Sequence, residues 1–123
     1  MMKATSGHFV LDKKVQFKDM ADVFPNILVT FLEETDQMPD DKDVLQMFIY
    51  LNQNSLKKNK KPEGYNRKGR MRMIFPIDKK EFYVKSTIAS AELVRITEKI
   101  GKMLSKAGVK HTIEWNALSS EAD

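Results

Sequence analysis

The chain has 123 residues, of which 31% are charged and 41% hydrophobic, and its formal net charge is +4. This length fits one domain with one core, so we expect residues 1–123 to fold as a single domain. The sequence contains no cysteine, which excludes disulfide scaffolds, thiolate metal sites and thiol nucleophiles. It shows no signal-peptide pattern and no run of 18 apolar residues, so we expect a soluble cytoplasmic protein.

The first part of the chain changes from a strand period to a helix period. Phe9, Leu11, Val15 and Phe17 alternate with polar residues, which predicts a strand that can break near Lys13. From residue 20 onward, apolar residues recur at three- and four-residue steps and predict an amphipathic helix. These residues are Met20, Val23, Phe24, Ile27, Leu28, Phe31 and Leu32.

Pro25 leaves two alternatives for the start of this helix. In the first, Pro25 lies in the first turn and Asp22 caps the helix. In the second, a longer helix begins near Lys18 and is kinked at Pro25. The apolar stripe is the same in both, and the acidic stretch that follows contains Pro39 and is expected to be a loop.

The middle of the chain predicts two strands. Apolar and polar residues alternate over residues 44–52, which favours a strand with one buried face. Met71, Met73 and Phe75 show the same alternation. We therefore expect a hairpin whose exposed basic loop spans residues 57–69.

The last third predicts a strand, a helix and a strand. Residues 82–88 form the first of these, and Ser90 is suited to cap the helix that Gly108 ends. Residues 109–115 alternate again and precede a polar tail over residues 117–123. The resulting order is βαβββαβ. It predicts an α+β fold in which two amphipathic helices cover one face of a mainly antiparallel sheet of about five strands.

Charge is unevenly distributed along the chain. Residues 57–72 contain eight basic side chains and one acid, a net +7, so the rest of the chain carries −3. Such segregation steers partners of complementary charge and favours a binding function. The acidic candidates for partner binding are Glu33, Glu34, Asp36, Asp40, Asp41 and Asp43. The candidates in the basic loop are Lys57, Lys58, Lys60, Lys61, Tyr65, Arg67, Lys68, Arg70 and Arg72.

Motifs for catalysis are missing from the sequence. Gly64 and Gly69 lack the spacing and the following Lys-Ser or Lys-Thr of a phosphate-binding loop, and no Gly-x-Ser-x-Gly occurs. We expect His8 to be exposed and His111 to be a satisfied, partly buried residue. The acids of residues 40–43 lack the alternating ligands and the glycine of an ion-binding loop. We therefore expect no catalytic residues, no metal and no cofactor.

Residues 57–72 also permit a second interpretation. Lysine and arginine at this density can neutralise phosphates while Tyr50 or Tyr65 stacks on a base. The alternative function is therefore a small nucleic-acid-binding protein that uses the basic hairpin. A charged loop can also serve only to keep a protein soluble and to prevent edge strands from associating. In that interpretation, residues 57–72 bind no partner.

Three segments share their order with a known family. Residues 48–51 form an apolar run, residues 62–69 read Pro-Glu-Gly-Tyr-Asn-Arg-Lys-Gly, and residues 71–78 form an apolar segment that closes on Asp78. This order resembles a small α+β family of immunity proteins from bacterial polymorphic toxin and contact-dependent inhibition systems. The strand over residues 7–14 and the proline-containing helix after it are also similar.

The resemblance implies a non-enzymatic protein that binds and neutralises a cognate toxin domain. If that toxin is a nuclease with a basic groove, the acidic residues are expected to fill the groove. If the toxin presents an acidic face, the basic loop is expected to dock there. The sequence leaves both alternatives open.

Overall fold

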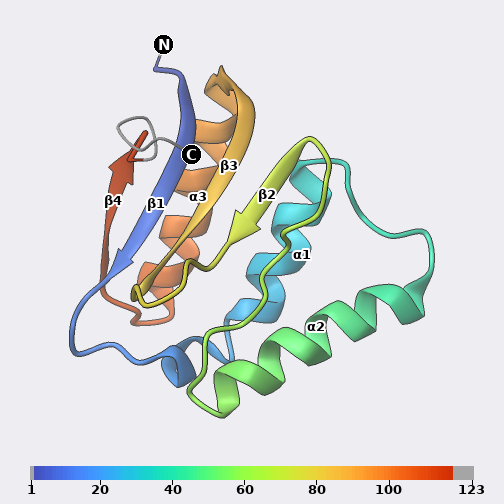
Figure 1. Cartoon of the computed structure of the whole chain (residues 1–123), viewed down its shortest axis with the longest axis vertical. Coiled ribbons are helices and arrows are strands. Elements are labelled where there is room, and N and C mark those ends of the chain that lie inside the picture. Colours follow the sequence, from blue (N-terminus) through green and yellow to red (C-terminus); the bar gives the residue numbers. More distant parts are fainter. Residues whose placement is uncertain (1, 118–123) are drawn as a thin grey trace.

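The computed structural model describes residues 2–117, which form four strands, three α-helices and one short 3-10 helix (Figure 1). In chain order these are β1 (Ala4–Leu11), η1 (Phe17–Met20), α1 (Phe24–Glu34), α2 (Lys42–Lys57), β2 (Met71–Ile74), β3 (Glu81–Ser90), α3 (Ala91–Lys106) and β4 (His111–Trp115). Apart from Ala117, the tail predicted over residues 117–123 lies outside the described residues.

The strands form one antiparallel sheet in the order β2-β3-β1-β4. β3 lies between β1 and β2, and β1 lies between β3 and β4, so two split βαβ units interlock. This is the connectivity of ferredoxin-like folds, with α2 as an additional helix. The predicted α+β class and antiparallel sheet are confirmed. The expected five strands and two helices are wrong, because residues 2–117 contain four strands and three α-helices.

The predicted strand over residues 44–52 is wrong, because this segment lies inside α2. Asp41 caps the helix: its carboxylate accepts a hydrogen bond of 2.8 Å from the Asp43 N–H. The buried side of α2 is formed by residues four apart, the helical spacing. They are Phe48, Asn52 and Leu56. No hairpin joins this segment to β2, and residues 58–70 instead connect a helix to a strand.

The ends of the other elements follow local chemistry. β1 stops at Leu11, and Phe17 belongs to η1 rather than to the first strand. Pro25 lies in the first turn of α1, but Val23 is the N-cap residue, so the predicted cap by Asp22 is wrong. Ser90 does cap α3, since its hydroxyl oxygen accepts a hydrogen bond of 3.0 Å from the Leu93 N–H.

The core lies between the sheet and the helices on one of its faces. α3 packs against β1 and β3, whereas α2 contacts α1 and η1 instead of the sheet (Figure 1). Phe82 is central, with ring centroids 4.6 Å from Phe9 and 4.8 Å from Phe75. Phe24 of α1 meets both Phe75 and Phe82 edge-on and ties that helix to the sheet.

A buried amide ties α2 to the segment that follows it. The Asn52 side-chain oxygen accepts a hydrogen bond of 2.7 Å from the Gly64 N–H, and its amide nitrogen donates to the Phe48 and Gly64 carbonyls. The next residue, Tyr65, exchanges two backbone hydrogen bonds with Met73 of β2, at 2.8 and 3.0 Å. Residues 64 and 65 therefore lie along the outer edge of β2.

A side chain at Gly64 is expected to destabilise the fold. Its φ is +72°, and a Cβ added there would lie 2.5 Å from the Met73 carbonyl oxygen. Gly108 has a similar φ of +77° but nothing within 4 Å, so it is a matched control for the backbone cost alone. We expect Gly108→Ala to cost about 1–2 kcal/mol of the free energy of unfolding. Gly64→Ala should cost at least about 1 kcal/mol more because of the contact.

Denaturant unfolding of both variants measures this difference. Equal losses in the two variants would show that the contact with Met73 contributes nothing.

Candidate functional site

The acidic candidates do not form one patch. Glu34 of α1 is engaged within the fold, because its carboxylate pairs with Arg95 at 3.0 Å and with Lys99 at 2.6 Å, both on α3. Glu33 and Asp36 are exposed at the end of α1. The three remaining acids lie at the start of α2, exposed to solvent. They are Asp40, Asp41 and Asp43.

The contribution of Glu34 to the free energy of unfolding is expected to decrease at low pH. The hydrogen bonds from Lys99 and then Arg95 hold the pKa of Glu34 below its ordinary value of 4.5. A carboxyl whose pKa is lower in the folded state stabilises that state above the unfolded pKa, and this contribution disappears as pH falls through the folded pKa. We expect the stability difference between the wild type and Glu34→Gln to shrink below about pH 4.5. Urea unfolding at several pH values tests this, and a constant difference down to low pH would contradict it.

The basic candidates divide into three groups. Lys57 ends α2 and Lys58 follows it, and Lys60 and Lys61 are also exposed there. This cluster lies at the opposite end of α2 from the acids, and 16 helical residues separate the two ends by about 24 Å. Among residues 2–117, no ion pair joins this cluster to the acidic candidates.

The second group packs against α2. The Arg67 guanidinium carbon lies 4.5 Å from the centroid of the Phe48 ring, a cation–π contact. The Tyr65 ring packs against Phe31 and Phe48, with centroids 6.0 and 5.7 Å away. Tyr65 is therefore a structural residue that joins α1 and α2, and Tyr50 is the exposed tyrosine of this region.

The third group lines a cleft of about 460 Å³ beside β2 and β3. Its basic side chains are Lys68, Arg70, Arg72 and Lys85, beside the hydroxyls of Ser86 and Thr87. Arg70 forms an ion pair with Glu92, and Arg72 donates a hydrogen bond of 3.3 Å to Asn66. Lys85 stands directly opposite Arg72 in the β2–β3 register and has no ion-pair partner among residues 2–117. Sequence reasoning missed Lys85, because only strand pairing brings it to Arg72.

The outer side of α2 carries an exposed apolar face. Met47, Tyr50 and Leu51 are 46%, 65% and 45% exposed and lie at i, i+3 and i+4, one side of a helix. Asp43 and Lys57 are exposed along the same side of the helix. We call these five residues the α2 face. The α2 face was not predicted, because residues 44–52 were expected to form a strand. The capping Asp41 and the four-residue recurrence of Phe48, Asn52 and Leu56 were sequence signals of a helix.

His8 is buried rather than exposed, so the expectation for it was wrong. Its side chain is 2% exposed, and its ring stacks on Tyr83 at 4.6 Å. Its Nδ1 lies 3.1 Å from the Glu81 carboxylate, and its Nε2 lies 2.9 Å from the Ser6 hydroxyl. Nδ1 therefore shares a hydrogen bond with the Glu81 carboxylate, and Nε2 shares one with the Ser6 hydroxyl, which can donate or accept. β1 and β3 position this chain of contacts.

The Ser6–His8–Glu81 chain has the connectivity of a hydrolase triad. A nucleophilic serine, however, needs access to the substrate and donors for the developing oxyanion. Ser6 is fully buried, and neither Ser6 nor His8 lines any of the clefts described for residues 2–117. We therefore interpret the chain of contacts as a polar network that satisfies a buried histidine.

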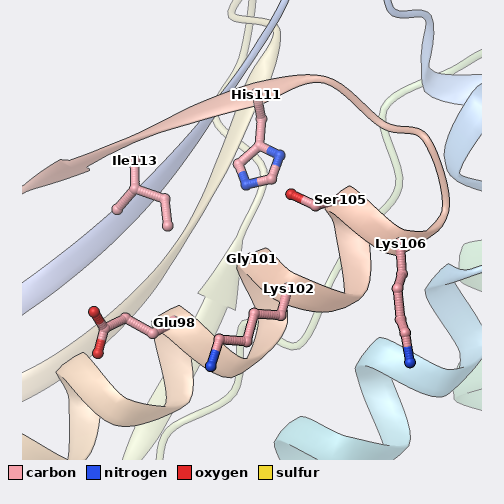
Figure 2. A pocket seen from close by; sticks show the side chains of 7 residues that line it. All are labelled: Glu98, Gly101, Lys102, Ser105, Lys106, His111 and Ile113. Carbon is pink, nitrogen blue, oxygen red and sulfur yellow. The ribbon is translucent and has the colours of Figure 1, made fainter.

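A groove of about 760 Å³ lies between α3 and β4 (Figure 2). Gly101 forms its floor, and His111 and Ile113 project into it from β4. His111 is half-buried, with Nδ1 2.9 Å from the Val109 carbonyl oxygen, as expected for a satisfied histidine. Glu98, Lys102 and Lys106 border the groove on the helix side.

The described part of the chain contains neither a cluster of metal ligands nor a membrane-spanning helix. Across residues 2–117, no group of three or more His, Cys, Asp or Glu side chains is placed to hold a metal ion. Within the same residues, no helix has the length and apolar character needed to cross a bilayer. Comparisons with known protein families, with curated proteins and with solved structures found no match to this chain.

Proposed function

We propose that this chain is a non-enzymatic protein-binding module that binds and neutralises a cognate bacterial toxin domain through the α2 face. The observation that carries the proposal is the exposure of Met47, Tyr50 and Leu51 on one side of a helix. Exposed apolar side chains that gather on one surface mark a site of interaction, whereas scattered ones are ordinary.

The composition of the α2 face suits a protein partner. Tyrosine is enriched among the residues that contribute most to binding free energy, and methionine adapts its shape to the surface that it meets. Asn52 and Phe48 hold α2 from its other side, so the α2 face is presented on a fixed helix. A rigid surface loses less conformational entropy on association.

The charges at the two ends of α2 indicate which surface charges a partner needs. Asp40, Asp41 and Asp43 at one end attract a basic surface, and the lysines beyond Lys57 attract an acidic one. Both charged groups flank the same apolar side chains. A partner that fits has an apolar patch between a basic and an acidic surface, so the acidic residues and the basic loop act together rather than as alternatives.

The assignment of a toxin as the partner rests on the family resemblance. Residues 62–69 and 71–78 support it through their sequence, whereas β2 ends at Ile74, before Asp78. Residues 48–51 weaken it, because they belong to a helix here and not to an apolar strand. The α2 face supports a protein partner independently of the resemblance.

Removing the α2 face should abolish protection from the toxin. In the Met47→Ala/Tyr50→Ala double variant, the two largest exposed contacts are lost. We expect a toxin domain to be encoded beside this gene, and the dissociation constant for that domain to rise at least about 30-fold. Calorimetric titration with that domain measures the affinity, and growth on co-expression measures protection.

Ile88→Ala is the matched control, because Ile88 is 70% exposed but lies at the end of β3, away from α2. It should bind as the wild type does. Full protection by the double variant, with an unchanged affinity, would contradict the role of the α2 face. A neighbouring toxin domain that the wild type fails to bind would contradict the toxin assignment.

The basic cleft favours a second candidate function, the binding of single-stranded nucleic acid. Arg72 and Lys85 are like charges directly opposite each other on neighbouring strands, an arrangement that is unfavourable until an anion lies between them. A phosphate there would neutralise both. This site replaces the predicted basic hairpin, because residues 44–52 are helical and supply no partner strand.

The cleft can be tested with an Arg72→Ala/Lys85→Ala double variant. If the cleft binds nucleic acid phosphates, the affinity for single-stranded RNA should fall, and the slope of log K against log salt should decrease by about 1–2. Gel shifts over a salt series measure both. Lys18→Ala, an exposed lysine of η1, is the control. An equal loss in Lys18→Ala, or no binding of RNA by the wild type, would contradict this function.

A further inference from the structure

The two edges of the sheet differ in whether another segment pairs with them. The outer edge of β2 is covered, because Tyr65 forms a two-way backbone bridge with Met73. β4 is the strand at the other edge and pairs only with β1 (Figure 1). Between residues 2 and 117, nothing pairs with its outer side.

The direction of the free backbone groups of β4 follows from its register. The Asp12 N–H donates to the Lys110 carbonyl, and the Asn116 N–H donates to the Ser6 carbonyl, at 3.0 Å each. Residues 110, 112, 114 and 116 therefore direct their backbone groups toward β1, since these groups alternate along an antiparallel strand. His111, Ile113 and Trp115 direct theirs outward.

This edge lacks several of the usual protections, although β4 is short and carries Glu114. Exposed edge strands are commonly guarded by lysine, by proline or by a bulge, and the sequence of β4, His-Thr-Ile-Glu-Trp, contains neither of these residues. Its register with β1 is regular over its whole length. The groove between α3 and β4 runs beside this strand and is lined by His111 and Ile113 on the strand side.

We propose that β4 pairs with β4 of a second copy of this chain. The two strands run antiparallel about a two-fold axis at Ile113, and the two four-stranded sheets become one continuous sheet of eight strands. A two-fold axis requires one surface to match itself. β4 meets this condition, because its outward backbone groups at residues 111, 113 and 115 are symmetric about residue 113.

The side chains on both faces of β4 suit this register. On the face toward α3, Ile113 meets Ile113 of the second copy, and His111 meets Trp115 of the second copy. On the other face, Thr112 meets Glu114 of the second copy. No pair of like charges is opposed along the strand, so the register carries no electrostatic penalty of the kind seen between opposed like charges.

The two ends of the groove carry opposite charges, and Lys102 lies between them. Glu98 borders it toward the beginning of α3, and Lys106 borders it toward the end (Figure 2). The two-fold axis reverses the direction of the second α3, so Glu98 of one copy lies on the side of Lys106 of the other. α2 lies away from β4 in the fold, so both α2 faces stay free in the dimer (Figure 1).

A single cysteine tests the pairing, since the natural chain has none. In an antiparallel hydrogen-bonded pair, the Cα atoms of opposed residues are about 5.5 Å apart, within the disulfide range of roughly 4.4–6.8 Å. Ile113→Cys in the full chain should therefore form a covalent dimer on mild oxidation. Thr112 is an exposed neighbour on the same strand, and in the proposed register it lies opposite Glu114 of the second copy and not opposite Thr112. Thr112→Cys should therefore remain largely uncrosslinked. Non-reducing gels measure both.

Sedimentation of the wild type over a concentration series gives a readout that needs no variant. We expect a monomer–dimer equilibrium, and Ile113→Lys should lower the association constant at least about tenfold, because two ammonium groups would meet at the axis. A wild type that stays monomeric at every concentration would overturn the proposal. So would a dimer in which Thr112→Cys crosslinks as readily as Ile113→Cys, because a different surface would then form the contact.

Discussion

The fold of this chain depends on one buried amide. Asn52 faces inward from α2 and receives the Gly64 N–H, so the chain leaving the helix is held against it. From there Tyr65 reaches Met73 and covers the outer edge of β2. A buried amide left without these partners would cost the full desolvation penalty of its polar atoms. The same contact therefore fixes the position of α2 and closes one edge of the sheet.

The position of α2 gives the molecule two sides with different properties. Because α2 packs on α1 and η1 and not on the sheet, one of its sides stays in water with Met47, Tyr50 and Leu51 exposed. Its acidic start and basic end complement the helix dipole, so the charges that flank this surface also stabilise the helix. The opposite side of the molecule ends in β4, a strand with unpaired backbone groups. The proposed protein-binding surface and the proposed self-pairing edge therefore share no residues.

Local sequence signals predicted most of the elements and failed where tertiary packing decided between periods. The helix α3 and its cap at Ser90 were predicted correctly, because the capping residue and the helical spacing of the apolar residues indicate the same element. Residues 44–52 were misread as a strand because apolar residues occupy both the buried and the exposed side of α2. With apolar side chains at Leu51 and Phe48 alike, period two and period 3.6 both fit residues 44–52, and the signals that separate them, the N-cap Asp41 and the buried Leu56, lie outside that segment.

The sequence by itself determined the α+β class, the Ser90 cap of α3, and the presence of strongly acidic and basic segments, because these depend on neighbouring residues. It did not determine which charged residues are available for a partner. Glu34 forms ion pairs with Arg95 and Lys99, which are far from it in the sequence. Lys85 lines the basic cleft and His8 is buried, and both positions also depend on residues distant in the sequence. Strand register and helix packing create these neighbours, and a linear pattern carries no information about which distant segments will meet.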